Sequence, residues 1–150
     1  MLQKSNLKRG QALVEFAFTI MLLVALVISI MDFSILLYDK AILTAASREG
    51  ARAGVVFRTD PNTGAYNPVT QAEIQTIVNN YLQSKLFTFG GSSTATTTAT
   101  PGSGLPPSQG GTGQQLDVLV TFQYTFLALP RFQGWNNTIN LSALTTMRYE

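Results

Sequence analysis

A single glutamate near the start of a long apolar run is the residue most open to a chemical role. Glu15 is the only ionisable residue in the run 12–31. A charged side chain deep in hydrocarbon costs about 2.5–3.5 kcal/mol on insertion scales, and less near the interface. One interpretation is that the Glu15 side chain extends to the lipid headgroups. The other is that it has a cationic partner, which the amino group of a chain cut after Gly10 could supply, since each charge would offset the other's desolvation.

A second charged cluster lies about thirty residues further along, at Arg48, Glu49 and Arg52. On a helix, residues three and four positions apart are neighbours, so Glu49 and Arg52 could form an ion pair. The cluster is interpreted either as a solvated helix face or as a contact to a neighbouring subunit or to the domain's own sheet. Small residues beside it would permit close packing, for which the chain's own strands are favoured over another subunit: Ala45, Ala46, Gly50 and Gly54.

Catalysis and metal binding are not expected. The chain has no cysteine and no histidine, which excludes thiol and imidazole chemistry and the usual metal ligands. Asp32 and Asp39 are seven residues apart and could share a helix face, but no acid–base partner accompanies them. We therefore expect no enzyme activity and no cofactor.

The positive charge is concentrated at the N-terminus. Lys4, Lys8 and Arg9 lie in the first ten residues, and the remainder is close to neutral. No basic stripe indicates a nucleic-acid partner. Basic residues before an apolar segment place the N-terminus in the cytoplasm by the positive-inside rule. At about 1.5 Å per residue the run 12–31 spans roughly 30 Å, the thickness of a bilayer's hydrocarbon core.

Helical patterning continues beyond this run, and one helix over about 12–57 is predicted. Its first half would lie in lipid and its second half under a domain that lies outside the membrane. The predicted contact stripe consists of Ile35, Tyr38, Ile42, Ala45 and Ala53, with Asp39, Lys40, Arg48 and Arg52 on other faces.

The remaining elements predict a small α+β domain. Thr70 and Glu73 have the spacing of a capping box and predict a second, short helix over 71–86. Alternating apolar residues predict two antiparallel strands near 116–126 and 139–148. A threonine-rich edge strand is expected within 92–100, and the Gly- and Pro-containing segment 101–115 is expected to be a flexible loop.

Three stretches of the N-terminal half resemble the TadE-like family, the minor pilins or pseudopilins of tight-adherence (Flp/Tad) pilus systems. They are Gly10-Gln11-Ala12-Leu13-Val14-Glu15-Phe16-Ala17, Met31-Asp32-Phe33 and Ala45-Ala46-Ser47-Arg48-Glu49-Gly50-Ala51-Arg52. The closing segment 141–148 also resembles the way the family ends.

The resemblance implies a pilin-like fold in which residues 1–10 are a leader, 11–31 span the membrane and 32–150 form an extracytoplasmic domain. A prepilin peptidase would cut between Gly10 and Gln11, and Glu15 would neutralise the new N-terminus and set subunit register. Candidate assembly contacts are Phe16, Arg48, Glu49 and Arg52. The implied partners are prepilin peptidase, other pilins, the Tad assembly machinery and the lipid bilayer of the bacterial cytoplasmic membrane. The implied role is pilus assembly and adhesion, with a place in the extracellular pilus as a further implication.

Two other interpretations remain open. A pseudopilin of a type II secretion-like machine would share the leader and the apolar helix. A single-pass anchor bearing an adhesive or ligand-binding domain would be neither cleaved nor assembled.

Overall fold

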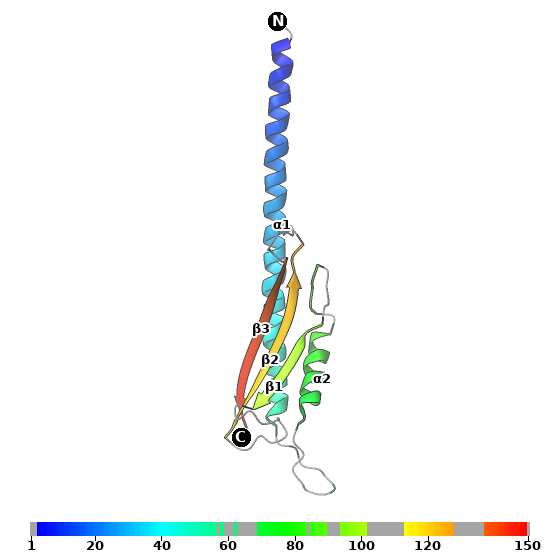
Figure 1. The fold of residues 1–150 in the computed structure, drawn as a ribbon, viewed down its shortest axis with the longest axis vertical. Helices are drawn as coiled ribbons and strands as arrows, with labels where there is room; N and C mark the ends of the chain where they lie inside the picture. The colour runs from blue at the N-terminus through cyan, green and yellow to red at the C-terminus, as the bar shows by residue number, and fades with distance from the viewer. Residues whose placement is uncertain are drawn as a thin grey trace.

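One long helix extends far beyond a small α+β domain (Figure 1). The computed structural model describes residues 3–56, 58, 62, 69–83, 85–89, 94–101, 113–127 and 137–149. In chain order the elements are α1 (Gln3–Gly54), α2 (Gln71–Leu82), β1 (Thr96–Pro101), β2 (Gln115–Thr125) and β3 (Thr138–Arg148). This arrangement confirms the predicted fold class.

Helix α1 is continuous over 52 residues and begins earlier than predicted. The basic N-terminal segment is helical from Gln3, because lysine, arginine, glutamine and leucine all favour helix. The helix ends at Gly54 rather than near residue 57. Two β-branched valines, Val55 and Val56, follow that glycine and lower the helix propensity further.

The three strands form an antiparallel sheet in the order β1-β2-β3. The predicted alternation is confirmed in β2, where Leu116, Val118, Val120, Phe122 and Tyr124 are all buried. The expected edge strand is β1, which runs from 96 to 101 rather than within 92–100. The predicted loop 101–115 was too long at both ends, since Pro101 and Gln115 lie in strands; its residues 102–112 lie outside the described residues.

Both helices cover the same face of the sheet. The C-terminal half of α1 packs on β2 and β3, and α2 packs beside β1 (Figure 1). In the described residues the opposite face is polar except for Leu119 and Leu144, which are paired across β2 and β3. Leu119 interrupts the alternation in the sequence because it belongs to this outer face.

The predicted contact stripe of α1 is confirmed only in part, because Ile35 and Ile42 pack against the core whereas Tyr38 is exposed. Its five residues are only half-buried or exposed, whereas Asp39, expected on another face, is fully buried. The helix turns a neighbouring stripe toward the sheet, consisting of Asp32, Asp39, Leu43, Ala46, Ser47, Gly50, Ala51 and Gly54. Small side chains bring the helix close to the strands, and the aspartates find backbone donors there.

Helix α2 starts as predicted and ends four residues early. The Thr70 hydroxyl accepts from the Glu73 N–H at 3.3 Å, and the Glu73 carboxylate accepts from the Thr70 N–H at 2.8 Å. This is the predicted capping box, and the Thr70 N–H lowers the pKa of the Glu73 carboxyl. The chain leaves the helix at Leu82 so that Leu86 and Phe89 can pack against the core.

Candidate functional site: the long helix and its junction with the domain

The predicted cleavage region lies on the free N-terminal part of α1. Gly10, Gln11, Glu15 and Phe16 are all exposed. Apart from its chain neighbours and the nearby helix backbone, none of the described residues has an atom within 4 Å of a Cβ built on Gly10, so this glycine is open to a partner. The Gln11 amide donates to the Glu15 carboxylate, with Nε2 3.2 Å from Oε1. The structure thus brings residues 11 and 15 together on one face, one helical turn apart.

The apolar run of α1 stands clear of the rest of the molecule. Among the described residues, α1 is the one helix long and apolar enough to cross a membrane, and 6% of its most apolar window is buried within the protein. Its hydroxyl groups do not require water, because each donates to a backbone carbonyl four residues earlier. These pairs are Thr19 to Glu15 at 2.9 Å, Ser29 to Ala25 at 2.8 Å and Ser34 to Ile30 at 2.8 Å.

Asp32 joins the end of this run to the sheet. The side chain is 5% exposed, and its carboxylate accepts from the Leu127 N–H at 3.2 Å and from the Tyr124 hydroxyl at 3.4 Å. Burial, reinforced by the negative charge of Asp32, raises the pKa of Tyr124 to about 12. The hydroxyl therefore stays protonated and remains a donor. Asp32 thus fixes the end of β2 to the helix at the point where the apolar run ends.

Asp39 performs a similar task two turns further along. Its Oδ1 accepts from the Phe87 N–H at 3.1 Å, whereas Oδ2 has no hydrogen-bond partner among the described residues. Burial raises the pKa of the Asp39 carboxyl. Both aspartates hold segments distant in sequence against α1. Their seven-residue spacing, which places both side chains on one face of the helix, is the signal in the sequence for this arrangement.

Helix α1 is also fastened to the outer strand β3. The Lys40 ammonium donates to the Ser142 carbonyl, which satisfies a backbone acceptor of this edge strand. The Ser47 and Thr145 hydroxyls lie 2.7 Å apart and share a hydrogen bond. These polar contacts fix the rotation of the helix against the sheet.

The charged cluster of α1 faces away from the domain. Arg48, Glu49 and Arg52 are exposed, and in the described part of the chain the single ion pair joins Arg58 to Glu73 at 3.8 Å. The ion pair considered between Glu49 and Arg52 is therefore absent. Among the described residues no hydrogen bond or ion pair joins the cluster to the sheet, which favours a solvated face or a contact to another subunit.

The small residues of α1 do pack on the chain's own elements, as favoured from the sequence. A Cβ built on Gly50 would lie 2.6 Å from Val78 Cγ2 and 3.4 Å from Val118 Cγ1. One built on Gly54 would lie 2.9 Å from Ile74 Cδ1. Glycine at these positions lets α2 and β2 approach the helix closely.

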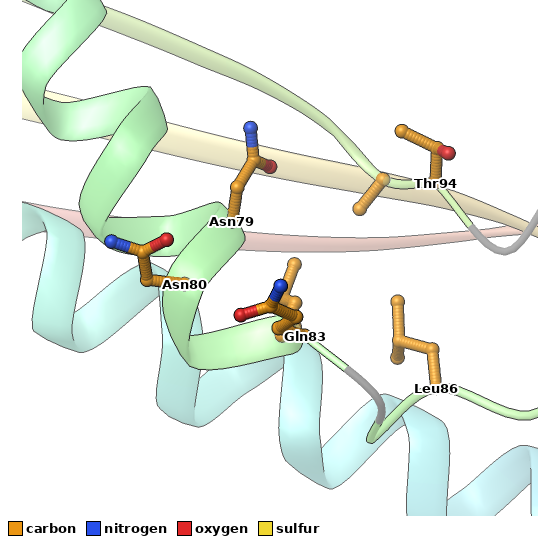
Figure 2. Close-up of a pocket in the computed structure, with 7 residues that line it drawn as sticks. Asn79, Asn80, Gln83, Leu86 and Thr94 are labelled. Atoms are coloured by element: carbon orange, nitrogen blue, oxygen red, sulfur yellow. The ribbon is translucent and has the colours of Figure 1, made fainter.

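A cleft at the end of α2 carries no catalytic groups. The cleft has a volume of about 380 Å³ and lies between the end of α2 and the segment entering β1 (Figure 2). Asn79, Asn80 and Gln83 line one side, with Leu86 and Thr94 across from them (Figure 2). These amides and apolar groups neither titrate nor act as strong nucleophiles. Within the described ranges, no group of three acidic, histidine or cysteine side chains is placed to hold a metal ion.

Comparison with known protein families gives a match to the long helix. Residues 10–52 match the family model described as TadE-like protein. The matched segment, less than a third of the chain, lies entirely within α1. It confirms over this helix the resemblance to the TadE-like family of Tad pilus systems. No curated protein and no solved structure gives a significant match to the chain.

Proposed function

We propose that this chain is a minor pilin or pseudopilin of a tight-adherence (Flp/Tad) pilus, a structural subunit rather than an enzyme. The main support for this proposal is that three features lie on the same helix, α1. These are the family match, the exposed apolar run and the surface on which the domain packs. The match begins at Gly10, where the leader is proposed to end, and closes at Arg52 in the charged cluster.

The precursor inserts in the cytoplasmic membrane with its basic leader inside and its domain outside. A prepilin peptidase then cuts between Gly10 and Gln11. The exposure of Gly10 and the empty space around it support this site. The new ammonium would lie on the first turn of the helix, where Glu15 already contacts residue 11. A carboxylate in this turn also interacts favourably with the positive end of the helix dipole.

During assembly the helix leaves the lipid and enters a bundle of similar helices. Its apolar side chains remain out of water in both environments, so the transfer conserves hydrophobic burial. A carboxylate without a cation would be costly inside such a bundle. Glu15 therefore favours the register in which it meets an N-terminal ammonium, its own or a neighbour's. The exposed residues Phe16, Arg48, Glu49 and Arg52 are the proposed contacts to other subunits.

The leader is tested by the intact mass of the protein extracted from membranes, for wild type and for Gly10→Leu. We expect wild type to begin at Gln11 and the variant to retain residues 1–10. Because the space around Gly10 is empty, the substitution disturbs no contact within the chain. Ala17→Leu, on the exposed surface of the same helix, adds a similar side chain away from the cut and should be processed normally. A wild-type protein that keeps residues 1–10 would instead be an uncleaved membrane anchor.

The register role is tested by Glu15→Ala. We expect normal membrane insertion and a loss of incorporation into pili, measured on sheared pilus fractions. Thr19→Ala is the matched control, since its hydroxyl only bonds the Glu15 carbonyl one turn away. Unchanged incorporation of Glu15→Ala would refute the register role and leave the cleavage proposal standing.

A further inference from the structure

The exposed apolar surface of α1 does not stop at the predicted end of the membrane span. Asp32 and Asp39 are buried under the domain, so the first exposed charge after Glu15 is Lys40. The helix rises roughly 37 Å between these two charges. This is longer than the hydrocarbon core, about 30 Å, but shorter than the whole bilayer with its headgroups, about 40–45 Å.

The domain adds apolar side chains of its own beside this surface. The Phe87 ring lies 6.2 Å from the Tyr38 ring, and Phe87 and Leu127 are 56% and 55% exposed. We call the exposed residues at this end of the domain the apolar collar: Phe33, Leu37, Tyr38, Phe87 and Leu127. The collar lies where α1 emerges from the sheet toward its N-terminus (Figure 1).

The two buried aspartates hold the collar in place. Asp39 accepts from the backbone N–H of Phe87, and Asp32 accepts from that of Leu127. A shallow apolar groove of about 390 Å³ lies between Tyr38 and Phe87. The exposed side chains of Phe87 and Leu127 are therefore attached to backbone that is hydrogen-bonded to α1.

We propose that the apolar collar lies in the outer interfacial layer of the bilayer, so that the domain is seated on the membrane surface. The headgroup region is where amphipathic aromatic rings such as that of Tyr38 are favoured. The headgroup layer on one side of the bilayer is about 5–7.5 Å deep. The roughly 37 Å of helix between Glu15 and Lys40 exceeds the hydrocarbon core by about 7 Å, so with Glu15 at the inner interface the last exposed apolar residues before Lys40 reach the outer headgroup layer.

The bilayer fits the collar better than a second copy of the chain does. The collar continues the apolar face of α1 without an intervening exposed charge. A helix that crosses the membrane therefore brings the collar to the headgroups in every subunit, whether or not a partner is present. The inference rests on the membrane insertion in the proposed function, but not on cleavage or assembly.

The full-length protein in phosphatidylcholine vesicles with brominated acyl chains tests this placement. Each variant carries one tryptophan in a background in which Trp135, the chain's only tryptophan, is phenylalanine. Leu37→Trp and Phe87→Trp report on the collar, and Leu22→Trp, in the middle of the span, reports on insertion. Leu144→Trp is the matched exposed control, about 20 Å along β3 from the collar end of the sheet.

We expect the collar tryptophans to emit at shorter wavelength than the Leu144→Trp control and to be quenched by the bromines, more strongly for shallow than for deep bromine positions. Leu22→Trp should be quenched most by the deep positions, and Leu144→Trp should not be quenched. Quenching at position 22 without quenching at 37 and 87 would overturn the collar proposal alone. No quenching at position 22 would overturn both the collar and the membrane insertion. A blue-shifted emission at positions 37 and 87 without quenching, lost when the protein is diluted with more lipid, would show that the collar contacts a second copy of the chain. That result would also overturn the proposal.

Discussion

Replacing Asp32 with alanine removes the acceptor that fixes the end of β2 to the helix. In the wild type the Leu127 N–H donates to this carboxylate at 3.2 Å. The Tyr124 hydroxyl lies 3.4 Å from the carboxylate and 3.3 Å from the Asp32 backbone carbonyl, which the substitution leaves in place. The Asp32 side chain is 5% exposed. Water therefore does not readily replace the lost carboxylate as an acceptor for these donors. The end of β2 and the residue that leaves it should therefore open more often.

The magnitude follows from these two contacts. Hydrogen bonds to a charged acceptor contribute about 1.5–3 kcal/mol each. Both distances here are at or beyond the long end of the usual range, so each bond should fall near or below the lower value. The variant also avoids the cost of burying a carboxylate, which offsets part of the loss. A net loss of about 1–2 kcal/mol remains, and at about 1.4 kcal/mol per tenfold change it corresponds to about five- to thirty-fold more frequent opening.

Amide hydrogen exchange of the full-length protein in detergent micelles measures this opening directly. We expect the peptide containing Leu127 to exchange about five- to thirty-fold faster in Asp32→Ala than in wild type. Tyr124→Phe removes one donor and keeps the bond to Leu127, so it should have a smaller effect. Ser34→Ala is the control on the same helix, because that hydroxyl bonds only the Ile30 carbonyl. Unchanged exchange in Asp32→Ala would show that the carboxylate does not fasten the strand to the helix.

Three further changes test the packing of the domain in thermal unfolding. Burial raises the pKa of Asp39, so ionisation of this carboxyl opposes folding. As the pH rises through that pKa, the melting temperature of wild type should fall relative to that of Asp39→Asn. A difference in melting temperature between the two proteins that stays constant with pH would contradict this. In Gly50→Ala the new methyl group would lie 2.6 Å from the β-branched Val78 side chain. Overpacking costs about 1–3 kcal/mol, more than the helix-propensity gain of about 1 kcal/mol, so the melting temperature should fall. Gly10→Ala, the control, should not lower it. Thr70→Ala removes the N-cap of α2 and should cost about 0.5–2 kcal/mol, unless the helix is held by its buried face alone.

The elements that could be predicted from the sequence are those specified by local signals. Period-two alternation in 116–126 fixes both the strand and its buried face, because adjacent side chains of a strand point to opposite sides. The Thr70–Glu73 spacing specifies a helix start through two short-range hydrogen bonds. The helix over the apolar run needs no tertiary partner to be recognised. For the same reason Gly10, Gln11 and Glu15 could be found as a candidate site.

The rotation of α1 against the sheet could not be predicted in this way. A stripe chosen by hydrophobicity favours Ile35 and Tyr38, whereas the structure buries Asp32 and Asp39. Their burial is tolerated because backbone N–H groups 48 and 95 residues away in the chain supply hydrogen bonds. Donors so remote leave no local pattern. The same holds for the apolar collar, which is visible only once the two aspartates are known to point inward.

The inward aspartates separate α1 into two surfaces with different environments. The residues that form the domain core begin at Asp32, whereas 6% of the most apolar window of the helix is buried in the protein. Extraction from the membrane would therefore change the surroundings of the helix without disturbing the packing of the domain. The collar is the exception, because it belongs to the domain and yet continues the lipid-facing surface. In the proposed assembly, a subunit that leaves the bilayer has to have its collar covered by neighbouring subunits or exposed to water. The hydrophobic cost of extraction would therefore arise at this end of the domain rather than in its core.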